Sequence, residues 1–273
     1  MAHCIVEEAE KILDKEFKVL DKGFVRLVDY LGSDERIVQS ARVSYGEGTK
    51  SYREDKGLIN YLLRNDHTSP FEQVNFTFHI KMPIFVARQW IRHRTARVNE
   101  ISGRYSIMSN EAYVPDEEHL NFQSADNKQG RSKETMSATE SIRIRNLIAE
   151  DQKRAFETYH TLLESDLARE IARINLPLSM YTQWYWQMDL HNLLHFLALR
   201  LDDHAQWEIR VYAMEIFKMV QLVTPMAASA FEEHKLKGKN FSSKEVDAIK
   251  EMLDGKECPL TGRARELFKA KLN

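Results

Sequence analysis

Four arginines and one histidine lie within the fourteen residues from Arg92 to Tyr105, which read RHRTARVNEISGRY. Guanidinium groups this close repel one another, and an arginine without a partner is costly to bury. Their planar forks bind phosphate or carboxylate through paired hydrogen bonds. The stretch therefore indicates either a solvated basic face or a binding site for an anion, most often a phosphate.

The first half of this stretch is predicted to end a helix. Pro83 is placed where a first helical turn tolerates proline, and PIFVARQWIRHR continues the helical pattern. Gln89, Arg92 and His93 then share one face, at spacings of three and four residues. An amide and a guanidinium side by side suit a planar anionic ligand, and a helix C-terminus favours cations. A charged, solvated helix face is the alternative.

The second half, NEISGRY, is predicted to be a loop with directional polar groups. Asn99 and Glu100 can donate to or accept from a ribose or a ring edge. Ser102 and Gly103 permit close backbone approach, so main-chain N–H groups could meet an acceptor. Arg104 adds another guanidinium. A simple surface turn is the alternative.

A second candidate cluster lies in DLHNLLHFLALRLDDHAQWE. His191 and His195 stand four residues apart, which is the spacing of two metal ligands on a helix. Zinc proteases need a glutamate directly after the first histidine, and Asn192 occupies that position. A third ligand is missing at the expected spacing. Two interpretations of these histidines are possible. They either form a ridge that faces a ligand, with Arg200 beside it, or are partly buried residues with a structural role.

Two further segments carry isolated polar groups. His67 precedes Ser69 and Glu72 in a polar turn, where these groups could bind a ribose or phosphate or could cap the next element. Arg173, in the helical segment AREIARINLP, is the remaining isolated cation. An unpaired arginine on a core face suggests a partner anion.

Composition narrows the class of protein. The 273 residues include 39 Lys and Arg and 41 Asp and Glu, a net charge of −2, which favours a small anionic ligand over nucleic acid. Cys4 and Cys258 form no Cys-x-x-Cys pair, so a zinc knuckle and a dithiol motif are excluded. No apolar run approaches the roughly 20 residues that cross a bilayer, and no signal pattern begins the chain. We expect a cytoplasmic protein without membrane contacts.

The predicted elements are few strands among many helices. Strands are expected at 17–30, as a pair joined by a turn, at 74–81 and at 179–189. Asp34 is expected to cap a helix that ends before Gly46, and further helices are expected at 53–65, 83–94, 140–164, 167–176, 189–201 and 205–223. Without a βαβ rhythm, this pattern predicts an α+β fold, with an antiparallel sheet packed with several helices in a single domain, residues 1–273. Residues 123–141 are predicted to form a mobile polar insertion, and 235–273 a charged C-terminal extension.

These motifs together resemble the flavin-dependent thymidylate synthase family. That family's signature is Arg-His-Arg, then seven residues, then Ser, which corresponds here to Arg92-His93-Arg94 and Ser102. The resemblance spans about residues 20 to 225. Its other motifs are ARVSYG at 41–46, HTSPFEQ at 67–73, PIFVARQW at 83–90, AREIARINLP at 168–177 and LRLDDHAQWEIRVYA at 199–213.

The resemblance implies an FAD-dependent methyltransferase of nucleotide biosynthesis. Such enzymes make dTMP by reductive methylation of dUMP, with methylene-tetrahydrofolate as the carbon donor and NADPH-reduced FAD as the hydride source. Neither cysteine has the setting of a nucleophile, which agrees with a reaction started by reduced flavin. The family is a cytoplasmic homotetramer whose active sites are shared between chains. No metal and no nucleic acid are implied.

The resemblance also implies roles for single residues. Arg200 is expected at the uracil, where a cation favours ionisation of N3, and His67 near the flavin ring and the folate. The residues expected to bind dUMP, from more than one chain, are Gln89, Arg92, Glu100, Ile101, Ser102, Gly103, Arg104, Arg173 and Arg200. Those expected to bind FAD are Ser44, Ser69, Glu72, Arg92, His93, Arg94, Asn99, Glu100, Asp189, His191, His195 and His204.

The chain departs from the family pattern at several of these positions. Arg97 stands where many members have serine, and Ser69 replaces a common threonine while keeping the hydroxyl. Many members have Asn or Ser near Asp189, Arg at His191 and Asn at His195. A histidine can still donate a hydrogen bond at these positions, but its reach and charge differ.

Overall fold

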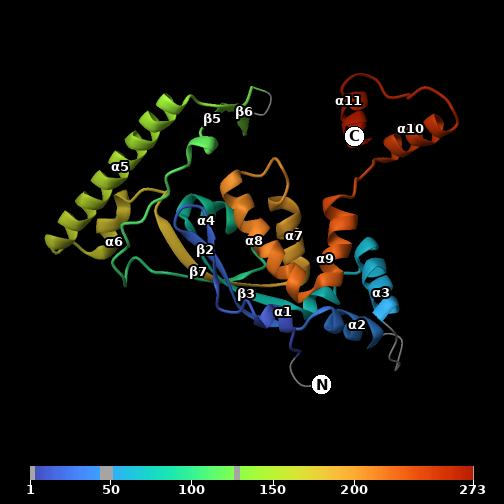
Figure 1. Ribbon diagram of the computed structural model, residues 1–273, viewed down its shortest axis with the longest axis horizontal. Helices are drawn as coiled ribbons and strands as arrows, with labels where there is room; N and C mark the ends of the chain where they lie inside the picture. Colours follow the sequence, from blue (N-terminus) through green and yellow to red (C-terminus); the bar gives the residue numbers. More distant parts are fainter. Residues whose placement is uncertain (1–3, 44–51, 126–129, 273) are drawn as a thin grey trace.

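A five-stranded antiparallel sheet forms the centre of the molecule (Figure 1). The structure, a computed structural model, describes residues 4–43, 52–125 and 130–272. The strand order is β1-β2-β3-β7-β4. The strands are β1 (Glu16–Val19), β2 (Gly23–Leu31), β3 (Asn75–Pro83), β7 (Tyr181–Asp189) and β4 (Arg97–Glu100). The predicted α+β class with an antiparallel sheet is confirmed.

Three predicted strand regions are present, because their apolar residues alternate. In β3, Phe76, Phe78 and Ile80 are fully buried, and in β7 the residues Trp184 and Trp186 are almost fully buried. Side chains of successive strand residues point to opposite faces, so these residues line one face of the sheet. The opposite face is polar and partly open, with Tyr185 43% exposed.

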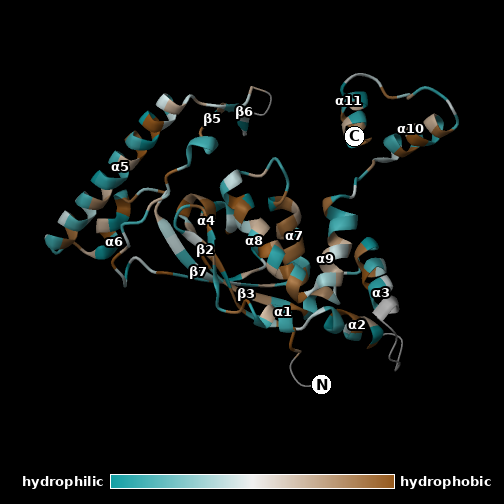
Figure 2. Ribbon diagram, viewed as in Figure 1, coloured by the Kyte–Doolittle hydropathy of each residue, from teal (hydrophilic) through white to brown (hydrophobic). Residues whose placement is uncertain are grey.

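Helices cover the apolar face of the sheet. The helices α4 (Ile84–Trp90), α7 (Leu190–Arg200) and α8 (Trp207–Val223) pack on β1, β2, β3 and β7. Figure 2 shows that α7 and α8 are largely hydrophobic, as buried helices must be. Trp90 lies at the centre of this layer, with its ring 4.9 Å from that of Phe196 and 5.4 Å from that of Trp186.

The remaining helices flank this centre. They are α1 (Glu7–Glu10), α2 (Asp34–Arg42), α3 (Tyr52–Arg64), α5 (Ala138–Glu164), α6 (Arg169–Ala172), α9 (Pro225–Phe231), α10 (Ser243–Leu253) and α11 (Gly262–Leu272). Most predicted helices are present. The helix predicted at 167–176 is only one short helix, α6, followed by a 3-10 turn at Arg173–Asn175.

Two predictions of local structure are wrong. The helix expected to reach Arg94 ends at Trp90, and the predicted loop beyond it contains β4, which pairs with the edge of β7. Asp34 does not cap its own helix. Its carboxylate accepts hydrogen bonds from the backbone N–H groups of Met226 and Ala227, at 2.7 and 3.0 Å, and so caps α9.

The predicted polar insertion contains regular structure on both sides of its undescribed residues. β5 (Asn121–Gln123) and β6 (Arg131–Thr135) form a two-stranded antiparallel sheet. The long helix α5 follows directly and carries this hairpin at one end (Figure 1). A second, smaller apolar cluster, which includes Met108, Phe156 and Tyr159, joins α5 to the rest of the chain.

The last two helices lie apart from the sheet. Figure 1 shows α10 and α11 beyond α9, away from the central layers. They are joined by an ion pair of 2.8 Å between Lys271 and Glu245, and the ring of Phe241 packs edge-on against Phe268. The capping box of Ser242 and Glu245 begins α10. The C-terminal extension is thus a helical pair with its own contacts.

Candidate active site

Helix α7 carries a ridge of candidate residues along one side. Asp189 ends β7 and caps α7, since its carboxylate accepts from the backbone N–H of Asn192 at 3.0 Å and from the Asn192 amide at 2.7 Å. His191 and His195 follow one turn apart, and Arg200 is the last helical residue. A cation in this last turn is stabilised by the helix dipole. The ligand-facing ridge predicted from the sequence therefore has the required geometry.

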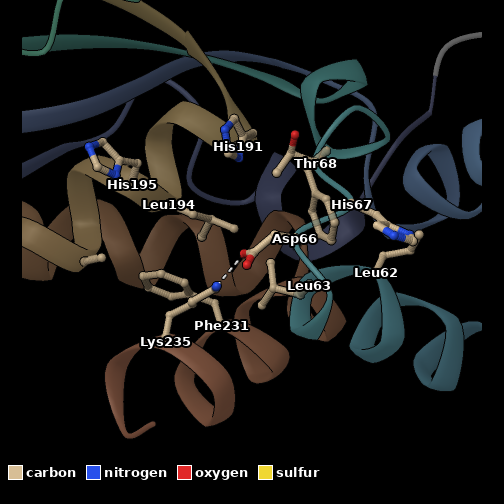
Figure 3. Close-up of a pocket in the computed structure, with 12 residues that line it drawn as sticks. Leu62, Leu63, Asp66, His67, Thr68, His191, Leu194, His195, Phe231 and Lys235 are labelled. Carbon is tan, nitrogen blue, oxygen red and sulfur yellow. Dashed lines mark hydrogen bonds and ion pairs between the residues drawn. The ribbon is translucent and has the colours of Figure 1, made fainter. Parts of the chain in front are cut away.

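A pocket opens beside this ridge (Figure 3). Its volume is about 190 Å³, and His191 and His195 lie on one side of it, opposite the loop after α3. Its other lining residues are mainly apolar, and they are Leu62, Leu63, Asp66, His67, Thr68, Phe71, Leu194, Ala198, Phe231 and Lys235. An ion pair of 2.5 Å between Lys235 and Asp66 borders it. An apolar wall with a few polar groups is typical of a small-molecule site.

His67 lines the same pocket but lies apart from the two histidines of α7. Its ring packs edge-on against Tyr61, with 5.6 Å between the ring centroids. Ser69 and Glu72 are exposed on the same loop. The structure thus brings His67 to the pocket that the α7 histidines line, and leaves the hydroxyl and the carboxylate open to solvent.

His93 and Arg200 form the most distinctive pair of the site. The Nε–H of Arg200 donates to Nε2 of His93 at 3.1 Å. Burial, and to a smaller extent the positive charge of Arg200 and the neighbouring His195, together lower the pKa of His93 to about 4. His93 is therefore neutral near pH 7 and can accept from a cation. Burial also lowers the pKa of Arg200.

This pair sets the orientation of the Arg200 guanidinium. Because Nε is used by His93, the two terminal amino groups remain for another partner. Among the described residues, no carboxylate forms an ion pair with Arg200. A half-buried guanidinium without a counter-ion attracts an anion more strongly than one in water, because the local dielectric constant is lower.

The predicted helix would place Gln89 and His93 on one face, but the structure directs their side chains to different helices. The helix ends before His93, whose ring turns toward α7 and packs edge-on against Phe196, at 4.9 Å. The amide of Gln89 instead donates to the side-chain oxygen of Gln206, at the start of α8. Gln89 and His93 thus lie against the two helices that meet at the α7–α8 turn.

The remaining arginines of the basic stretch are exposed. Within the described part of the chain, Arg92 and Arg94 have no ion-pair partner, so they are available to an anionic ligand. In β4, Arg97 and Asn99 lie opposite Gln187 and Tyr185, on the polar face of the sheet.

Glu100 points to the other face of β4. It lies opposite Trp184 and accepts a hydrogen bond of 2.6 Å from the Thr182 hydroxyl. Asn99 and Glu100 therefore face opposite sides of the sheet edge, and cannot contact one ligand from the same side.

A second cluster surrounds the turn after β4. Gly103 packs against Arg173, such that a Cβ at Gly103 would lie 3.0 Å from the Cδ and Nη1 atoms of Arg173. Arg104 forms an ion pair of 3.1 Å with Glu170 of α6. Arg173 is exposed, so its predicted place on a core face is wrong. The predicted approach of the Ser102 and Gly103 backbone to an acceptor of a ligand stays a prediction.

The two clusters lie far apart within one chain. The backbone N–H of Ile101 donates to Gln183, near the start of β7, whereas Asp189 ends that strand. Six strand residues span about 20 Å. In Figure 1, α6 lies beside α5 while α7 lies near the centre of the molecule. The loop after β4 and the start of α7 therefore lie at opposite ends of β7.

The other predicted contacts are scattered. Ser44 lies outside the described residues. His204 is exposed, and its ring nitrogen lies 2.9 Å from the carboxylate of Asp202. No group of three or more His, Cys, Asp or Glu side chains in the described ranges is arranged to hold a metal ion. In the same ranges, no helix combines the length and apolar character that would let it cross a membrane.

Sequence reasoning missed several residues that shape the site. Asp66, Lys235 and Phe231 had no signal beyond ordinary polar or apolar character, whereas Gln206 lies within the motif LRLDDHAQWEIRVYA. Thr68 stands beside the predicted Ser69, and its place in HTSPFEQ was the available clue.

The side chains around the α7 pocket fit a dinucleotide cofactor such as FAD. Apolar residues and histidines beside α7 suit a planar ring, and the free guanidinium groups of Arg92 and Arg94 suit a diphosphate. The 190 Å³ pocket is small for a whole dinucleotide, so the exposed arginines would hold the cofactor outside it.

Comparison with known proteins shows the same family by sequence and by structure. Residues 26–226 match the family described as "Thymidylate synthase complementing protein", and residues 239–273 match "Thymidylate synthase ThyX C-terminal domain". A solved UMP/dUMP methylase PolB from Streptomyces cacaoi, bound with 5-Br dUMP, is 33% identical with a TM-score of 0.74, covering 81% of this chain and 99% of its own.

Curated relatives extend the match over nearly the whole chain. The flavin-dependent thymidylate synthase of Treponema denticola is 60% identical and covers 95% of this chain and 98% of its own length. That of Treponema pallidum is 55% identical, covering 100% and 89%. The chain belongs to the family of flavin-dependent thymidylate synthases.

Proposed function

We propose that this protein methylates dUMP to dTMP, with methylene-tetrahydrofolate as the carbon donor and NADPH-reduced FAD as the hydride source. The observation that carries the proposal is the pair of Arg200 and neutral His93, at the end of a ridge whose histidines line an apolar pocket. Membership of the family supports it. We place the reaction in the cytoplasm as part of the same proposal.

Arg200 binds and polarises the uracil ring in this proposal. Its terminal amino groups face a ring that becomes negatively charged when N3 loses its proton, and a desolvated cation stabilises that charge. His93 accepts from Nε and remains neutral, so it adds no competing positive charge. Bound FAD would supply the hydride, and the protein would position the reactants around it.

The phosphate of dUMP would be held by the second cluster, from a different chain. Arg173 and Arg104 offer guanidinium groups beside the backbone of Ser102 and Gly103. Arg200 and this cluster lie apart in one chain, so a complete site requires a second copy. The homotetramer with shared sites, expected from the family resemblance, meets this requirement.

In this proposal, FAD is bound by the residues around the α7 pocket. His191 and His195 border the pocket, and Arg92, Arg94 and the exposed loop of Ser69 and Glu72 lie open to a cofactor that extends beyond it.

The test is the absorption spectrum of the purified protein. We expect a flavin band that bleaches anaerobically when NADPH and dUMP are added, followed by dTMP formation when methylene-tetrahydrofolate is present. A colourless protein that binds no added FAD would overturn the proposal.

Arg200→Ala tests the assigned role. We expect at least about a hundredfold loss of dTMP formation, since an electrostatic group at a developing charge contributes on that order, while FAD stays bound. Arg143→Ala, which removes an exposed arginine of α5, is the matched control and should leave turnover unchanged. Unchanged turnover in Arg200→Ala would remove this residue from the reaction.

A further inference from the structure

A buried carboxylate connects the β5–β6 hairpin to the α7–α8 turn. Glu208 lies in the first turn of α8 and is only 1% exposed. Its two oxygens lie 2.5 and 2.6 Å from Nη2 of Arg131 in β6. The hydroxyl of Tyr113 donates to the same carboxylate at 3.2 Å. The hairpin thus supplies the counter-ion of a charge that would be costly to bury alone.

The hairpin is also fixed at this point by a second contact. Arg131 donates through Nη1 to the backbone oxygen of His119 at 3.2 Å. The ring of His119 lies 4.6 Å from that of Trp207, the first residue of α8. The polar insertion therefore packs on the N-terminus of α8, next to Gln206.

Hydrogen bonds continue from Glu208 to Gln89. The amide nitrogen of Gln206 donates to Glu208 at 2.9 Å, and the oxygen of Gln206 accepts from the amide nitrogen of Gln89. Burial alone raises the pKa of Glu208, but the hydrogen bonds and charge of Arg131 outweigh it, and the net pKa is below its ordinary value. The carboxylate is thus ionised near pH 7 and can only accept hydrogen bonds.

The donor and acceptor at each step of this series of hydrogen bonds follow from the ionisation of Glu208. An acceptor at Glu208 requires that the Gln206 amino group face it, so that the Gln206 oxygen faces Gln89. That oxygen in turn requires the Gln89 amino group. The Gln89 oxygen is then left for another donor. This assignment follows from the chemistry of the groups and not from the choice between amide nitrogen and oxygen in the coordinates.

We propose that Arg131 and Glu208 are positioning residues that fix the amide of Gln89, through Gln206, so that Gln89 presents its carbonyl oxygen to an N–H or O–H donor of the nucleotide. The inference rests on the proposed function, in which Gln89 contacts dUMP. It gives the hairpin a role in the substrate site, although Arg131 touches no ligand.

Glu208→Gln is the principal test. A glutamine at this position can accept or donate, so the orientation of Gln206 and Gln89 is no longer fixed. We expect the Kd of the FAD-loaded enzyme for dUMP, from calorimetry, to rise about tenfold, the effect of roughly one hydrogen bond. The kcat at saturating dUMP and the bound flavin should stay near the wild-type values. Glu134→Gln, in the exposed part of the same hairpin, is the control and should bind dUMP as the wild type does.

Two further variants separate positioning from structural damage. Gln206→Leu removes the relay and leaves the Glu208 carboxylate paired with Arg131 and Tyr113, and it should show the same rise in Kd even if Glu208→Gln fails to fold. The exchange variant Glu208→Gln with Gln206→Glu returns an acceptor-only group to the side of Gln89. We expect its dUMP affinity to recover relative to Glu208→Gln, which damage to the fold would not allow.

The outcomes distinguish this inference from the proposed function. Wild-type protein that neither binds dUMP nor makes dTMP would overturn the proposed function. Wild-type protein that does both, with an unchanged Kd for dUMP in Gln206→Leu, would overturn the relay and leave the function standing.

Discussion

At the scale of single residues, the site depends on the protonation state of His93. A protonated His93 could not accept the Nε–H of Arg200, and two cations would then lie side by side. Burial, Arg200 and His195 together hold the pKa of His93 at about 4. Arg200 therefore keeps its orientation over the whole range of physiological pH.

The titration of His93 can be measured directly. We expect its imidazole NMR signals to show a neutral ring down to about pH 4, with the signals assigned by comparison with His93→Gln. A titration near the ordinary histidine value of about 6.5 would contradict the burial and charge argument.

The sign of the linked stability follows from this lowered pKa. The folded protein favours the neutral form, so the contribution of His93 to stability is fully present above about pH 6.5 and is lost as the pH falls toward 4. The free energy of unfolding of the wild type should fall in this window relative to that of His93→Gln.

The sequence could predict the types of these residues but not their pairing. The Arg-His-Arg signature marked His93, and the DLHNLLHFLALRL helix marked Arg200. Their contact depends on how the end of α4 packs against α7, more than 100 positions later in the chain. Arg173 shows the same limit, since an apolar sequence around it suggested a core face while its short helix leaves it exposed.

At the scale of elements, α9 is held by a residue from the other end of the chain. Asp34 accepts from two backbone N–H groups in the first turn of α9, which contributes Phe231 to the pocket. Such a cap supplies acceptors that a helix start lacks. Local pattern placed Asp34 at the start of its own helix, because the sequence does not show a partner almost 200 residues away.

Asp34→Ala should destabilise the protein by about 1–2 kcal/mol, the usual cost of losing a helix cap. The neighbouring, exposed Glu35→Ala is the control and should lie within about 0.5 kcal/mol of the wild type. Chemical denaturation followed by circular dichroism measures both. Equal stability of the two variants would show that Asp34 does not hold α9.

The pH dependence of this cap has the opposite sign to that of His93. Burial raises the pKa of Asp34 to about 6, against the lowering effect of its two backbone hydrogen bonds. The protonated form is thus favoured in the folded state. The proton-linked contribution of Asp34 to the free energy of unfolding should be fully present below about pH 4, near the unfolded pKa, and should be lost as the pH rises through about 6.

Elements whose apolar residues recur at a regular spacing could be predicted from the sequence. Elements that form only by pairing with a distant strand could not. The strands β3 and β7 and the helices α5, α7 and α8 all have clear apolar patterns. β4 reads RVNE, with too few apolar residues to indicate a strand, and it forms by adding to the edge of β7. Arg97, one of the positions where the chain departs from the family pattern, lies in this strand on the polar face of the sheet.

At the scale of the whole molecule, the proposed function divides the site residues of one chain into two groups that would each form half of a site. Arg200 with the α7 pocket is one half, and Arg173 with Gly103 and Arg104 is the other. The arginine stretch runs between them, since its first residues lie near α7 and its last residues pack on α6. The family resemblance already divided the dUMP-binding residues between chains, and the structure adds the contacts within each group, Arg200 with His93 and Arg173 with Gly103.

Mixing two inactive variants tests whether the halves meet between chains. Arg200→Ala and Arg173→Ala chains should each make little dTMP alone. If they are unfolded together and refolded as mixed oligomers, some sites receive both intact arginines, and about one quarter of wild-type activity should return when pairing across a symmetric interface is random. Two different Arg200 variants mixed in the same way, Arg200→Ala and Arg200→Gln, are the control and should stay inactive. If the Arg200→Ala and Arg173→Ala mixture also stays inactive while its chains assemble normally, each site must be built within a single chain. That result would require α6 and α7 to approach each other by a rearrangement of the fold.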